Sequence, residues 1–194
     1  EKVFNMKRLL LILILTFSFQ TLTKADDIRD FEIEGMSIGD SALDYFSIIK
    51  LKKHKMKWYK DDKFYGVQIL TPSGLYDAII FHFKKDDKKY IIHAAGGIKD
   101  YEFNIIECYS KKKQIDKDIK TLFSNTKFSH NTKRKHEADK SGKSYITNSF
   151  SDIENGTIST GCYDWSAEIG YTDSFRITIS TQEIESWFST AQNY

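Results

Sequence analysis

The sequence has 194 residues, of which 40% are hydrophobic and 14% aromatic. This composition argues against a disordered chain, and the length suffices for one well-buried domain. With 29 basic and 27 acidic residues, the chain offers no general electrostatic case for binding nucleic acid.

An export signal is predicted at the N-terminus. Met6 and two basic residues precede an apolar run from Leu9 to Phe19, and small residues follow up to Ala25. The run is shorter than the roughly 20 apolar residues of a membrane span, so a permanent anchor is the weaker interpretation. We expect translation to start at Met6, cleavage near Ala25, a periplasmic or secreted location, and no transmembrane span in the mature chain. Removing residues 1–25 leaves 25 basic and 26 acidic residues, a net charge of −1.

The first element expected in the mature chain is a helix that ends near Lys50. Ser37 can cap this helix, with Asp40 three residues later. One face of the helix would carry Ile38, Ala42, Tyr45, Phe46 and Ile49.

A basic run from Lys50 to Lys63 contains Trp58 and Tyr59. Lysines interleaved with aromatic residues can bind a polyanion or an anionic lipid surface. The favoured interpretation is a solvated loop whose aromatic side chains fold back onto the core.

Three strands are expected next, over Phe64 to Leu70, Leu75 to Phe83 and Tyr90 to Ala95, because these runs are rich in apolar and β-branched residues. The charged tip between the last two strands predicts a hairpin. An even-numbered loop centred on residues 86 and 87 pairs His82 with Ile91 and Ile80 with His93. Both histidines would then lie on one face.

A long helix should follow, because residues at alternating spacings of three and four form one stripe. Asn104 can cap this helix, with Glu107 completing a capping box. Only Lys112 interrupts the apolar stripe, which otherwise consists of Ile105, Cys108, Ile115, Ile119 and Leu122.

Residues 127–143 are polar and predict a loop or linker. Strands are then expected over residues 144–154 and 157–165, joined by Asn155 and Gly156 in a type I′ turn. That turn pairs Ile146 with Trp165. Ile146, Phe150, Tyr163 and Trp165 would then share one face, which we expect to point to the core. Cys162, Ser149, Thr160 and Asp164 would lie on the opposite face.

A last strand over residues 175–180 and a closing helix, capped by Ser180 with Glu183, complete the chain. The predicted fold is therefore one α+β domain over residues 26–194. An antiparallel sheet, or two small sheets, would have the element order α-βββ-α-βββ-α.

Cys108 and Cys162 are the only cysteines, and an even pair in an oxidising compartment predicts a disulfide. The register counts against the pairing, because a helix packed on the aromatic face would keep Cys108 away from Cys162. Two buried free thiols are the alternative.

Candidate chemistry is sparse. Phosphate-binding glycine motifs, zinc-protease histidine pairs and the serine elbow are missing from the sequence. His82 and His93 could act as acid and base, or share a metal, with a carboxylate such as Asp164. The favoured alternative is two histidines in ordinary structural roles. Tyr163 and Trp165 could form a platform that binds sugar or peptide, although aromatic residues in strands usually belong to the core.

Four segments carry a family resemblance, at residues 31–41, 81–92, 106–109 and 162–165. In these segments the chain resembles small exported proteins of marine alphaproteobacteria, a group whose function is uncharacterised. The resemblance implies export and a shared fold, and it supplies no catalytic residues. Both cysteines lie inside the shared motifs, which favours the disulfide.

The leading functional hypothesis is a non-enzymatic binding or accessory protein of the cell envelope. It would work without cofactor or metal, and its partner would be an unknown envelope protein or small ligand. The alternatives are a periplasmic hydrolase using His82 and His93, and a binder of polyanions or anionic lipid through Lys50 to Lys63.

Overall fold

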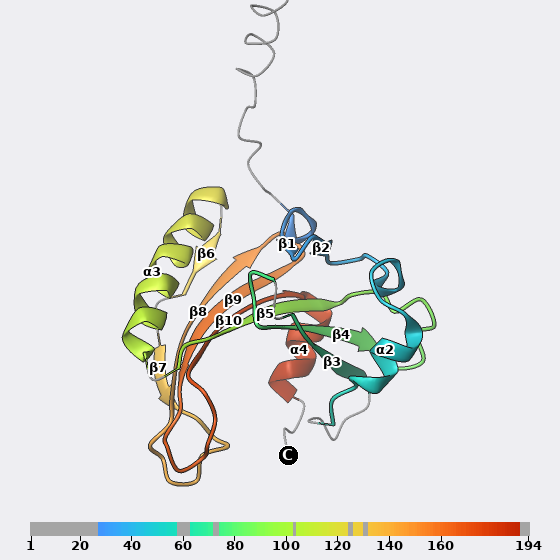
Figure 1. Cartoon of the computed structure of the whole chain (residues 1–194). Coiled ribbons are helices and arrows are strands. Elements are labelled where there is room, and N and C mark those ends of the chain that lie inside the picture. The colour runs from blue at the N-terminus through green and yellow to red at the C-terminus, as the bar shows by residue number, and fades with distance from the viewer. Residues whose placement is uncertain are drawn as a thin grey trace, which may run out of the picture.

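The structure is a computed structural model and describes residues 27–57, 63–71, 74–102, 104–123, 126–129 and 132–190. Trp58, Tyr59 and the expected export signal lie outside this part of the chain. Within it the predicted α+β class is confirmed, since one eight-stranded antiparallel sheet carries helices on both faces (Figure 1). The strand order is β3-β4-β5-β10-β9-β8-β6, and β7 also pairs with β8.

The predicted strand units form one continuous sheet because β5 pairs with β10. The sheet strands are β3 (Phe64–Leu70), β4 (Ala78–Lys84), β5 (Ala94–Asp100), β6 (Lys127–Phe128), β7 (Thr132–Lys135), β8 (Tyr145–Ile153), β9 (Gly156–Asp164) and β10 (Ser174–Thr181). The helices are α2 (Ile48–Lys53), α3 (Ile105–Leu122) and α4 (Gln182–Thr190).

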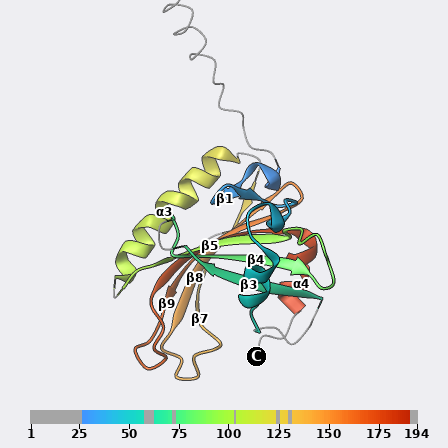
Figure 2. The same ribbon diagram turned by 45° about the vertical axis from the view of Figure 1, so that its right-hand side comes forward.

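The two faces of the sheet differ in composition and in what covers them. Ile79, Gly97, Ile177 and Thr160 lie in one row across β4, β5, β10 and β9. The face that holds this row, called here the core face, is apolar and is covered by α3 and by residues 27–53 (Figure 1). The opposite face, called the open face, carries α4 at one end (Figure 2).

Large side chains fill the core face. Phe81, Phe83 and Phe175 are fully buried there, together with several isoleucines. Each such side chain contributes roughly 1.5–3 kcal/mol relative to remaining exposed. The sheet is therefore anchored from one side, which leaves part of the open face available to solvent and ligand.

Helix α3 forms as the sequence predicts. The Asn104 side-chain oxygen accepts from the Glu107 N–H at 3.2 Å, and the Asn104 amide donates to the Glu107 carboxylate at 2.8 Å. The buried stripe of α3 differs from the predicted apolar one, because Lys112 and Asp116 are buried together with Cys108 and Ile119. The stripe is partly polar, and it faces a matching polar strip of the sheet.

The predicted first helix is wrong. Before the residues predicted as helical, residues 32–37 form a hairpin in which β1 (Glu32–Ile33) pairs with β2 (Met36–Ser37). Glu34 and Gly35 both have positive φ in its two-residue turn, and Gly39, with φ 94°, turns the chain again. The 3-10 helix Ala42–Asp44 and the six-residue α2 take the place of the one long helix predicted up to Lys50, and a further 3-10 helix, Ile28–Asp30, precedes the hairpin.

The central hairpin has a different register from the predicted one. The strand expected at residues 90–95 begins at Ala94, and His82 pairs with Ala94 in place of Ile91. Gly96 and Gly97 lie at the centre of β5, where a Cβ at Gly97 would be 2.5 Å from the Tyr76 ring. The glycines allow this close packing, and they remove the apolar signal that marks a strand in sequence.

The turn between β8 and β9 lies one residue earlier than predicted, so the pairing of the two strands is shifted by two residues. Ile153 pairs with Gly156, so the loop consists of Glu154 and Asn155, and Asn155 has φ 65°. Gly156 lies within β9, where a Cβ would be 2.2 Å from Ile28 and 2.3 Å from the Ser180 carbonyl oxygen. Packing space rather than backbone freedom requires glycine here.

The segment 127–143 is not a loop throughout, because β6 and β7 pair with the outer edge of β8. All four residues of β7 are exposed, so the strand shows no apolar alternation. Lys133, Arg134 and Lys135 place charge on this edge, which discourages pairing with another chain.

Candidate ligand-binding groove

A groove of about 800 Å³ lies on the open face, where β5 and β10 meet two loops, residues 136–144 and 165–173. A narrower pocket of about 250 Å³ adjoins it toward α4, and the two share Ile98 and Arg176. Volumes of this order are typical of small-molecule sites. The larger groove is lined by Gln68, Ile98, Asp100, His136, Glu137, Ala138, Lys140, Trp165, Ile169, Tyr171, Thr172, Ser174 and Arg176.

Arg176 and Ser174 form the floor of the groove. The Arg176 guanidinium lies 4.0 Å from the centre of the Tyr163 ring, a cation–π contact. The Arg176 Nε–H and the Ser174 hydroxyl are buried, and neither forms a hydrogen bond with a described residue. Buried polar groups normally have partners, so this pair of groups marks the floor as a place where a ligand can bond.

Aromatic rings from two loops form one wall. The His136 and Trp165 rings lie 4.2 Å apart, and the Tyr171 ring meets Trp165 edge-on at 5.0 Å. Trp165 also stacks on Tyr163, with an interplanar angle of 28° and 6.1 Å between ring centres. Together these rings offer flat apolar surface beside the guanidinium of Arg176.

Asp139 ties the two loops together. Its carboxylate accepts from the hydroxyls of Ser144 and Ser166 at 2.5 and 2.9 Å, and from two backbone N–H groups. These bonds, led by the one from Ser144, hold the pKa of Asp139 well below its usual range. A second carboxylate, that of Asp173, accepts a hydrogen bond from the backbone N–H of Trp165 at 2.8 Å. The loops are thereby held side by side at one end of the sheet (Figures 1 and 2).

The groove also contains acidic residues and a histidine. Burial raises the pKa of Asp100, and the nearby Asp77 raises it further, while Arg176 opposes both effects. Burial lowers the pKa of His136, and the positive charge of Arg176 lowers it again. His136 is therefore neutral at pH 7, so its ring can stack on Trp165 without a charge.

The sequence predicted part of this site. Tyr163 and Trp165 share a face as expected, because they are two residues apart and side chains alternate along a strand, but this is the open face and not the predicted core-facing one. Asp164 pairs with Tyr145 on the core face side, away from the groove. The sequence analysis did not identify Arg176 as a site residue, although a single basic residue within an apolar strand is a signal of a functional position. His136 and Tyr171 lie in loops, where no sequence pattern indicated that they belong to the groove.

The predicted histidine pair lies at the other end of the open face. The His82 ring meets Phe188 of α4 edge-on at 5.0 Å, and the His93 ring meets Phe64 at 5.4 Å. His82 is only 6% exposed, and burial lowers its pKa to about 3. The His93 N–H donates to the His82 carbonyl oxygen at 2.9 Å. Both rings therefore belong to the apolar contact between α4 and the sheet.

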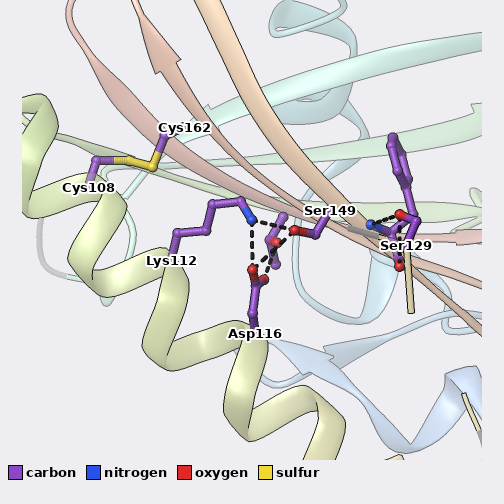
Figure 3. A network of polar contacts seen from close by, with 8 residues as sticks. Cys108, Lys112, Asp116, Ser129, Ser149 and Cys162 are labelled. Atoms are coloured by element: carbon purple, nitrogen blue, oxygen red, sulfur yellow. Dashed lines mark hydrogen bonds and ion pairs between the residues drawn. A yellow bond between two sulfur atoms is a disulfide. The ribbon is translucent and has the colours of Figure 1, made fainter. Parts of the chain in front are cut away.

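A polar cluster lies between α3 and the core face (Figure 3). The Lys112 ammonium contacts the Asp116 carboxylate at 2.7 Å and the Ser149 hydroxyl at 2.6 Å, and the Thr160 hydroxyl donates to Asp116 at 2.5 Å. All four side chains are less than 10% exposed. The cluster is therefore placed to fix α3 on the sheet rather than to meet a ligand.

The predicted disulfide is present next to this cluster. Cys108 of α3 and Cys162 of β9 are joined, with their Cα atoms 6.0 Å apart (Figure 3). The register argument against the bond was wrong in one step. Cys162 does lie on the face predicted for it, but α3 packs on that face and not on the face of Tyr163.

Neither a cluster of metal-ligating side chains nor a membrane-spanning helix is found in the described part of the chain. No group of three or more histidine, cysteine or acidic side chains there is arranged to hold a metal ion. None of the helices in that part is long and apolar enough to cross a membrane.

Comparison of the chain with protein-family models gave no match, and comparisons with curated proteins and with solved structures gave none either. The resemblance to exported alphaproteobacterial proteins therefore stays a prediction.

Proposed function

We propose that this protein is exported to the periplasm and acts there as a non-enzymatic binding protein of the cell envelope, with the groove as its ligand site. The observation that carries the proposal is the gathering of His136, Trp165 and Tyr171 from two loops above the buried polar atoms of Ser174 and Arg176. Sites that bind small molecules typically combine aromatic walls with a small number of convergent polar groups.

The disulfide supports the proposed location. Disulfides persist in oxidising compartments and are rare where thiols are kept reduced. The bond between Cys108 and Cys162 is therefore consistent with a protein that works outside the cytoplasm.

A hydrolase using His82 and His93 has less support. A general acid or base must reach the substrate and titrate near the working pH. His82 is buried against Phe188, and a pKa of about 3 keeps it neutral at pH 7.

A second candidate function is attachment to an anionic membrane surface through α2. Ile48 and Ile49 are 44% and 80% exposed, and Lys50, Lys52 and Lys53 flank them. Exposed apolar residues beside lysines suit the boundary of an anionic bilayer. This candidate predicts binding to phosphatidylglycerol vesicles that weakens with salt and is lost in an Ile48→Ser/Ile49→Ser variant.

The groove proposal is tested with a panel of neutral sugars, acidic sugars and short peptides, measured by calorimetry. A ligand of the groove should bind the wild-type protein and lose at least tenfold in affinity in Trp165→Ala. Tyr45→Ala is the matched control, because Tyr45 is a 45% exposed aromatic residue outside the groove. Equal loss in both variants, or no effect of Trp165→Ala on any ligand, would contradict the proposal.

A further inference from the structure

We propose that the groove recognises an acidic sugar, with Arg176 and Ser174 binding the carboxylate and the aromatic wall stacking on the sugar ring. This inference rests on the proposed function, since it names the class of ligand for the same groove.

The charge comes from Arg176, which forms no ion pair with any described carboxylate. Its guanidinium contacts the Tyr163 ring at 4.0 Å, and its Nε–H is buried without a hydrogen bond to a described residue. A guanidinium stacked on a ring keeps its N–H groups in its own plane, where they can bond to both oxygens of a carboxylate. The floor of the groove is thus built to receive an anion.

Ser174 adds a second group at the same place. It lies two residues before Arg176 on β10, so both side chains are on the open face. Ser174 is 2% exposed, and its hydroxyl forms no hydrogen bond with a described residue although it lines the groove. A hydroxyl can donate to the carboxylate that Arg176 holds.

The rest of the groove favours a sugar over a simple inorganic anion. Trp165 and Tyr171 offer flat apolar surfaces for a ring. Asp100, Glu137 and Gln68 also line the groove, and their oxygens accept hydrogen bonds from hydroxyls. These carboxylates would repel a polyanion, whereas a ligand with one carboxylate and several hydroxyls can satisfy both kinds of group.

The experiment compares galacturonic acid with its methyl ester, which keeps the ring and hydroxyls and removes the one charge. We expect the acid to bind and the ester to bind roughly tenfold to a hundredfold more weakly, the range of one charge-assisted contact. Arg176→Gln should abolish the preference for the acid, and Arg176→Lys should retain part of it. Arg134→Gln on the exposed edge strand is the control. If the arginine variants do not fold, Ser174→Ala provides the test. This variant should lose less affinity than Arg176→Gln, and it should lose it for the acid and not for the ester.

The outcomes separate this inference from the proposed function. If acid and ester bind equally and both depend on Trp165, the groove binds ligand but the role of Arg176 is overturned. If a tripeptide with a free C-terminus binds the groove and the sugar acid does not, the sugar class is overturned. If no compound of the panel depends on Trp165, the proposed function itself fails.

Discussion

The Lys112 ammonium lies 2.7 Å from the Asp116 carboxylate one turn further along α3, and both side chains are buried against the sheet. Burial lowers the pKa of Lys112, and the bond to Asp116 opposes that shift. A buried pair of this kind is weak evidence for stability, but losing one partner leaves an uncompensated charge. The pair therefore commits α3 to one position on β8 and β9, where Ser149 and Thr160 complete the hydrogen bonds.

We predict that Lys112→Met lowers the free energy of unfolding by about 3–5 kcal/mol, because Asp116 stays buried without its cation. Urea unfolding measures this change. The matched control replaces the whole cluster with apolar residues, as Lys112→Met, Asp116→Leu, Ser149→Ala and Thr160→Val. That variant should recover most of the stability, and a loss as large as in the single variant would contradict the explanation.

The disulfide should stabilise the fold by restricting the unfolded chain. Cys108 and Cys162 are separated by 54 positions, and closing a loop of that length is worth about 4 kcal/mol in the chain-entropy model. Replacing both cysteines with alanine should lower the free energy of unfolding by roughly that amount. Unfolding of the wild-type protein with and without reductant checks the value. If reductant also lowered the free energy of unfolding of the double-alanine variant, the stabilisation could not be assigned to the disulfide.

The burial of His82 predicts a loss of stability in acid. An unfolded chain takes up a proton at this side chain near pH 6.5, whereas the folded protein does so only near pH 3. Between these values the unfolded state binds more protons, so stability falls as the pH falls from 6.5 to 3 and is fully present above 6.5. Since one pKa unit corresponds to about 1.4 kcal/mol, the contribution is roughly 5 kcal/mol.

The variant His82→Leu tests this assignment, because it keeps an apolar contact with Phe188 and cannot titrate. The curve of unfolding free energy against pH should flatten between pH 6.5 and 3, whatever constant offset the substitution adds. His93 and His136 also have lowered pKa values and leave a smaller slope in the variant. A curve parallel to that of the wild type would rule out His82 as the main source.

The sequence determined those elements whose signal is local. Asn104 and Glu107 fix the start of α3 through bonds within one turn. Strand β3 matches the predicted Phe64 to Leu70, because its apolar run is bounded by polar residues on both sides. Tyr163 and Trp165 could be placed together because side chains alternate along a strand.

Only the tertiary structure decided which surfaces meet. The polar residues Ser149 and Thr160 were predicted on the face opposite Tyr163, away from the helix, yet the buried charges of α3 complement them, so α3 covers that face and Cys108 reaches Cys162. The glycines of β5 and Gly156 serve contacts with residues distant in sequence, which no local pattern encodes. The groove likewise joins Arg176 with rings from two separate loops, since convergence in space depends on strand order and not on spacing along the chain.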